Sequence, residues 1–172
     1  MGPTIAALHF GPVSHPSLGL PPVDFSAAHP AGADRLRANA DVIAARALEA
    51  AVDRDPTLQT RYDEVGLRHL LRDTTVYLDR IALAVASGQT GFAAEWTEWC
   101  APLYRRRGVP MDDLISISEG LRKAVRAFLA PEEMPEADQA IDEAIVNLRW
   151  NRRIAGDARK RNRLLAFIYK GA

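Results

Sequence analysis

The sequence is poor in the residues that carry metal sites, disulfides and acid–base chemistry. Its 172 residues include one cysteine, Cys100, and four histidines, three of which precede residue 30. A single cysteine excludes an internal disulfide and a zinc site built from several cysteines. The 22 basic and 22 acidic residues cancel, so the net charge identifies no partner.

Long hydrophobic runs and catalytic motifs are also missing. No window approaches the roughly 20 apolar residues of a membrane span, and the N-terminus lacks the pattern of a signal peptide. The chain is therefore predicted to be cytoplasmic and to have no contact with a membrane. There is no glycine-rich phosphate loop, no His-Glu-x-x-His and no strand-turn-helix that would present a nucleophile. We expect a protein that is not an enzyme and holds no metal.

Residues 1–33 are predicted to be irregular. They contain six prolines and four glycines, and these residue types oppose a long helix. The histidines of this segment match no metal-binding spacing.

From residue 34 the apolar residues recur at helical spacing, and no segment alternates with the period of a strand. Asp34 is a candidate N-cap, and Asp112 or Asp113 is a second one. Proline and glycine mark the ends of the segments. The predicted helices cover 34–55, 57–86 with a bend at Gly66, 90–107, 112–128, and 136–148.

These segments predict an all-α domain over residues 34–148, a globin-like helical bundle of five to seven helices. Residues 149–172 are predicted to form a basic, helical extension, with eight basic residues against one acidic. Its candidate contacts to a partner or an anionic surface are Arg152, Arg153, Arg159, Lys160, Arg161 and Arg163. A solvated charged face is the favoured interpretation of these residues, helix pairing into a dimer comes next, and binding to nucleic acid is not favoured.

Several short motifs resemble phycobiliproteins in order and spacing. Leu70-Leu-Arg-Asp-Thr-Thr-Val-Tyr-Leu, followed by a small apolar run to Gly88, is similar to the central helix of that family, where the pattern is Cys-x-Arg-Asp, three residues and Tyr-Leu. Leu103-Tyr104, then Gly108-Val-Pro110, is similar to the family's Gly-x-Pro start of the next helix. The resemblance spans residues 34–148 and implies a globin-like, phycobiliprotein-like fold.

The resemblance also implies a pigment site, from which this chain departs. In the family the cysteine of Cys-x-Arg-Asp carries a linear tetrapyrrole, and here Leu70 takes its place, so covalent attachment at this position is impossible. Arg72 and Asp73 correspond to the residues that hold the pigment's propionate and pyrrole nitrogens. Tyr77 matches a frequent pocket aromatic. A bilin could therefore be held only non-covalently.

A second resemblance covers the same stretch. Non-haem globin sensor domains of bacterial stress-signalling proteins have an aromatic-rich helix followed by a motif similar to Arg105-Arg-Arg-Gly-Val-Pro-Met-Asp-Asp-Leu114. Such domains lead through a C-terminal helix towards a signalling partner, and the extension over 149–172 is similar. This resemblance implies a sensor that needs no cofactor.

The candidate ligand-binding residues are Leu70, Arg72, Asp73, Tyr77, His69, Trp96 and Trp99. Arg72 and Asp73 have an alternative role as a structural pair between helices. His69 would be a partly exposed polar residue, and the helices from Thr90 to Leu148 contain no histidine that could ligate haem. Stripes of aromatic residues at helical spacing are usually core, so packing is the favoured role of the tryptophans. Cys100 is expected to be a buried apolar residue.

The function predicted from these observations is binding without catalysis. The first hypothesis is a globin-like sensory or interaction domain that forms a homodimer, contacts a signalling protein and holds no haem or other cofactor. The alternative is a photoreceptor or carrier that binds a bilin or another planar ligand non-covalently.

Overall fold

The computed structural model describes residues 28–155, which form seven α-helices, one short 3-10 helix and no strand. No helix in this range is both long and apolar enough to cross a membrane. The helices are α1 (Pro30–Ala38), α2 (Ala40–Arg54), α3 (Thr57–Arg61), α4 (Glu64–Ser87), α5 (Gly91–Arg106), α6 (Met111–Val125), the 3-10 helix η2 (Pro131–Glu133) and α7 (Met134–Ala155).

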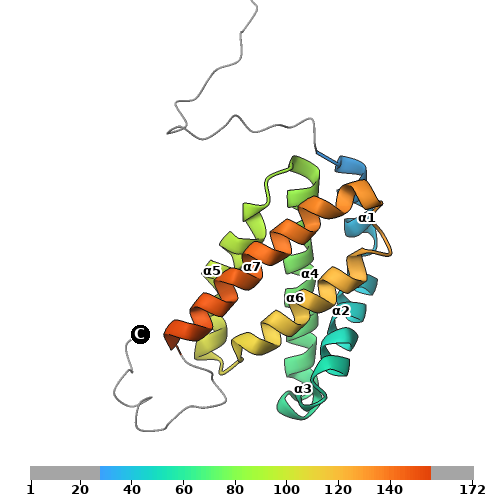
Figure 1. Ribbon diagram of the computed structural model, residues 1–172. Coiled ribbons are helices and arrows are strands. Elements are labelled where there is room, and N and C mark those ends of the chain that lie inside the picture. Colours follow the sequence, from blue (N-terminus) through green and yellow to red (C-terminus); the bar gives the residue numbers. More distant parts are fainter. Residues whose placement is uncertain (1–27, 156–172) are drawn as a thin grey trace, which may run out of the picture.

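Helix α4 runs through the centre of the bundle and contacts α1, α2, α5 and α7. Helix α6 lies between α2 and α7, and α5 runs alongside α7 (Figure 1). The chain enters the bundle at His29, whose backbone N–H donates to the Val85 carbonyl at 2.8 Å. The bundle therefore has two packing regions around α4, one with α2 and α6 and one with α5.

The first predicted helix is two helices, and its start was wrong. Helix α1 begins at Pro30 with His29 as N-cap, so Asp34 is inside a helix and residues 30–33 are not irregular. Proline at the first helical position lacks only an N–H that would have no partner there. The chain changes direction at Asn39, whose side-chain amide donates to the Arg35 carbonyl at 2.8 Å. The predicted end before Pro56 is confirmed.

The second predicted helix is interrupted at Tyr62 rather than bent at Gly66. Tyr62 has an extended backbone with φ −118° and ψ 138°. Asp63 then caps α4, because its carboxylate accepts from the backbone N–H of Gly66 at 2.7 Å. Gly88 ends the helix with φ 72°, as glycine at this position predicts.

The aspartates near the start of α6 do not cap it. Pro110 occupies the N-cap position, and the Asp113 side chain is buried and pairs with residues of α3 instead. Helix α6 ends at Val125, so Phe128 lies beyond it and is half-buried. Helix α7 begins at Met134, two residues earlier than predicted, and continues past Leu148 to Ala155 without a break at the predicted domain boundary.

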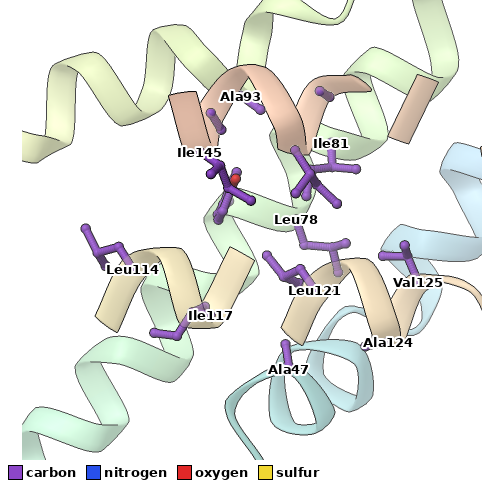
Figure 2. Close-up of a cluster of buried hydrophobic side chains, with 14 of the residues drawn as sticks. Ala47, Leu78, Ile81, Ala93, Leu114, Ile117, Leu121, Ala124, Val125 and Ile145 are labelled. Carbon is purple, nitrogen blue, oxygen red and sulfur yellow. The ribbon is translucent and has the colours of Figure 1, made fainter. Parts of the chain in front are cut away.

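The core is built mostly from alanine and branched aliphatic residues (Figure 2). Leu78 and Ile81 of α4 meet Leu121 of α6, while Ala47 of α2 lies below them. Gly120 of α6 lies against Ala47 so closely that a Cβ atom would come within 2.2 Å of the Ala47 carbonyl oxygen. The crossing of α2 and α6 therefore requires a residue without a side chain at this position.

Candidate functional site

Three aromatic rings gather where α4 meets α5. The rings of Tyr77 and Trp96 are stacked, with centroids 4.9 Å apart and planes 13° apart. Tyr104 approaches Trp96 edge-on at 6.4 Å. Tyr77 and Tyr104 are buried and Trp96 is partly buried. This aromatic cluster fills the region between the two helices.

The aromatic cluster leaves a cavity of about 10 Å³ among residues of α4, α5, α6 and α7. Such a volume holds about one water molecule. The lining residues are Leu70, Asp73, Thr74, Tyr77, Trp96, Tyr104, Leu114, Ile117 and Leu148.

Asp73 is held by residues on both helices. The Tyr104 hydroxyl donates to Asp73 Oδ2 at 2.9 Å, and Arg72 donates to Asp73 Oδ1 from Nη2 at 3.1 Å. The Arg72 side chain is 66% exposed, whereas that of Asp73 is 19% exposed. Arg72 therefore lies at the surface, and Asp73 is the charged group that faces inward.

A second, larger pocket lies on the other side of Leu70. Its volume is about 160 Å³, and it is lined by Tyr62, Gly66, His69, Leu70, Asp73, Tyr104, Arg107 and Val109. Leu70, Asp73 and Tyr104 line both spaces, so they form the wall between the small cavity and this pocket. The pocket combines an apolar floor with a carboxylate, an imidazole and a guanidinium.

A partly buried charge network fixes one rim of this pocket. Arg61 donates two hydrogen bonds to Asp113, from Nε to Oδ2 at 3.0 Å and from Nη2 to Oδ1 at 2.9 Å. It also donates to Asp55 Oδ2 at 3.0 Å, and the Tyr62 hydroxyl donates to Asp113 Oδ2 at 2.7 Å. The two parallel bonds of an arginine fork set orientation as well as distance. The network therefore holds the Tyr62 ring against the pocket.

Burial raises the pKa of the titratable groups that point into the α4–α5 region. The pKa of the Cys100 thiol rises to about 12 because the charged form would be desolvated. Desolvation also raises the pKa of Tyr77 and Tyr104, and Asp73 raises that of Tyr104 further. The Tyr77 hydroxyl is buried without a hydrogen bond of acceptable geometry, although Ser118 is close enough to influence its pKa. None of these groups is ionised at neutral pH.

The structure brings most of the predicted ligand residues together. Leu70, Asp73, Tyr77 and Trp96 surround the small cavity, and His69, which is exposed, lines the larger pocket. Arg72 lines neither space. Trp99 is 71% exposed, so the expectation that it packs in the core was wrong. The buried face of α5 is offset from the predicted tryptophan stripe and consists of Ala93, Thr97, Cys100, Ala101 and Tyr104.

Little in the sequence indicated Arg107, Val109 and Tyr62 as pocket residues. Arg107 and Val109 follow α5, and Tyr62 lies between α3 and α4. Such positions carry no periodic signal, because only the tertiary packing of the loops brings them to α4. Gly108, with φ 76°, marks the turn that places both neighbours beside the pocket.

The predicted basic contacts fall in two parts. Arg152 forms an ion pair with Asp112 at 3.0 Å, and Arg153 is exposed. The other four, Arg159, Lys160, Arg161 and Arg163, lie outside the described residues, as do residues 1–27 of the N-terminal segment.

Between residues 28 and 155 no three histidine, cysteine, aspartate or glutamate side chains gather as a metal site. Comparison with protein families finds a match over residues 26–148 to the model described as phycobilisome protein. A search of curated proteins finds no match.

Proposed function

The chain belongs to the phycobilisome protein family, and from this premise we propose that it is a globin-like interaction module whose pigment position is closed by its own side chains. Such a module acts in signalling or assembly, as a dimer and without catalysis or haem. The observation that carries the proposal is the packing around Leu70, because phycobilisome proteins bind bilins and this is the position that corresponds to their attachment cysteine.

An attached, enclosed bilin does not fit these residues. Leu70 is 3% exposed and offers no thiol, and the one cysteine, Cys100, is buried on α5. Behind Leu70 the stacked rings of Tyr77 and Trp96 leave only about 10 Å³, whereas ligand pockets usually measure about 300–1,000 Å³. Asp73 is occupied by Tyr104 and Arg72. At the pigment position the space is thus filled, and the Asp73 carboxylate is hydrogen-bonded, by the protein's own side chains.

The test is an absorption titration of the purified full chain with biliverdin, with haem in parallel. We expect no narrowed or red-shifted band that survives gel filtration. Leu70→Ala is the matched variant, because it opens the wall between the cavity and the larger pocket without touching Asp73. A stable band with the unaltered chain would contradict the closed-site proposal.

The larger pocket supports a second candidate function, the non-covalent binding of a small planar anion or of one end of a bilin. Its 160 Å³ is too small for a whole tetrapyrrole, but it presents Arg107 beside Tyr104 and Asp73. A guanidinium suits a carboxylate because its planar fork donates two bonds. If this candidate is correct, biliverdin should bind weakly, and Arg107→Ala should weaken the binding while Arg106→Ala, a neighbour outside the pocket lining, should not.

A further inference from the structure

Helix α7 carries a row of large apolar side chains on its outer surface. Val146, Trp150 and Ile154 are 64%, 58% and 66% exposed. Their four-residue spacing places them on one face of the helix, while Ile145 and Leu148 point into the core. Single exposed apolar residues are ordinary, but a continuous row over two turns is typical of an interaction surface.

Exposed charges flank this row. Arg149 and Arg153 are exposed on α7, and Glu95 and Glu98 are exposed on α5. Within residues 28–155 none of the four has an ion pair, in contrast to Arg122, which bonds Asp138 and Asp142. Among the residues that the structure describes, both signs of charge therefore lack an ion-pair partner beside the apolar row.

Two hydrogen bonds fix how α5 and α7 lie relative to each other. The Thr90 hydroxyl donates to Glu143 Oε1 at 2.7 Å, and the Asn147 amide donates to the Ala94 carbonyl at 3.1 Å. Both join residues 53 apart, so the two helices run in the same direction with a constant offset (Figure 1). The same offset places Glu98 level with residue 151, between Arg149 and Arg153.

The acidic and basic residues lie on opposite sides of the apolar row. Asn147 points towards α5. At about 100° per residue, Trp150 is about 60° around α7 from Asn147, whereas Arg153 is about 120° and Arg149 about 160° away. The surface therefore has an acidic ridge on α5, an apolar row in the middle and a basic ridge on the far side of α7.

We propose that this surface binds the same surface of a second copy of the chain, around a two-fold axis parallel to α7. A rotation about such an axis leaves each residue at the same height along α7 and exchanges the acidic and basic sides of the surface. The apolar rows then meet each other, and Glu95 and Glu98 of each copy face Arg149 and Arg153 of the other. This is the self-complementarity that an isologous interface requires. The proposal rests on the proposed function, for which it supplies the interface.

Sedimentation equilibrium of the full chain tests the apolar row. The unaltered chain should dimerise, and Trp150→Ser should weaken the dimer by at least about ten-fold, as expected for a central aromatic contact. Val42→Ser is the control. Val42 is 48% exposed and lies on α2, which packs against α4 and α6, so its replacement should leave the dimer constant unchanged.

A charge exchange tests the orientation. One variant carries Arg149→Glu with Arg153→Glu, and the other carries Glu95→Arg with Glu98→Arg. Each variant alone places like charges opposite one another and should be monomeric, whereas an equimolar mixture should form a heterodimer. Circular dichroism and the thermal midpoint of each variant confirm that it is folded.

Two results overturn the proposal. If the unaltered chain dimerises and Trp150→Ser and the charge variants dimerise equally well, the interface lies elsewhere and the proposed interaction function stands. If the unaltered chain remains monomeric up to its highest soluble concentration, both this interface and the dimeric part of the proposed function fail. The closed-site test with biliverdin is independent of either result.

Discussion

The two sides of helix α4 are packed in opposite ways. On the side of α2 and α6, Leu78 and Ile81 of α4 pack near Leu121 (Figure 2), and Gly120 of α6 is pressed against the Ala47 backbone of α2. Towards α5 the contact is built from stacked aromatic rings, a buried carboxylate and two spaces that the side chains do not fill. On the first side a Cβ atom at position 120 would collide with the Ala47 backbone, whereas the second side leaves space beside its rings.

The largest expected effect is at the crossing of α2 and α6. Gly120→Ala should lower the free energy of unfolding by about 2–3 kcal/mol, because the new methyl group forces α2 and α6 apart. Urea unfolding measures this change. Gly91→Ala is the control, since no atom lies within 4 Å of the added methyl group, and it should be neutral or slightly stabilising. Equal effects of both changes would show that the crossing is not tight.

Tyr104→Phe should have a smaller effect on the aromatic side. It removes the 2.9 Å bond to Asp73 but leaves the ring in place and Arg72 still bonded to the carboxylate. We expect a loss of about 1–2 kcal/mol in the free energy of unfolding, at the low end for a hydrogen bond to a charged acceptor, because Arg72 still pairs with the carboxylate. A loss as large as that of Gly120→Ala would mean that the α5 side of α4 tolerates substitution no better than the crossing of α2 and α6.

Acid should weaken the ion pair between Asp55 and Arg61, which belongs to the network at the rim of the larger pocket. Hydrogen bonds from Thr57 and the neighbouring Arg61 lower the pKa of Asp55 from its ordinary 3.8 to about 2. Because the folded-state pKa is the lower one, the carboxylate stabilises the fold at neutral pH, and this contribution disappears as the pH falls from about 4 to about 2. The pair is partly exposed, so the effect is modest. Urea midpoints across this range should decline less steeply in Asp55→Asn.

Tyr77→Phe should have the smallest effect, with the opposite sign. Its hydroxyl is buried without a well-formed hydrogen bond, so its removal should leave the free energy of unfolding unchanged or raise it by up to about 1 kcal/mol. The stack on Trp96 is retained. A clear loss of stability in urea unfolding would show that Ser118 or a water molecule satisfies this hydroxyl.

The sequence alone determined the fold class and the family. Helical spacing and the placement of proline and glycine correctly indicated an all-α bundle, and the motif around Leu70, Arg72 and Asp73 identified the family that the comparison confirms. These signals are local, since each depends on residues within a few turns of one helix. For the same reason the ends before Pro56 and at Gly88 were predictable.

Only the tertiary structure decided what occupies the site. Whether Tyr77 stacks on Trp96, whether Asp73 turns to Tyr104, and whether Trp99 faces the core or water depend on how α5 is rotated against α4. A rotation of one helix moves a whole stripe from core to solvent without changing its spacing. Asp113 was likewise a predicted candidate for a helix cap. Its side chain instead bonds Arg61, 52 residues away, in a partly buried network.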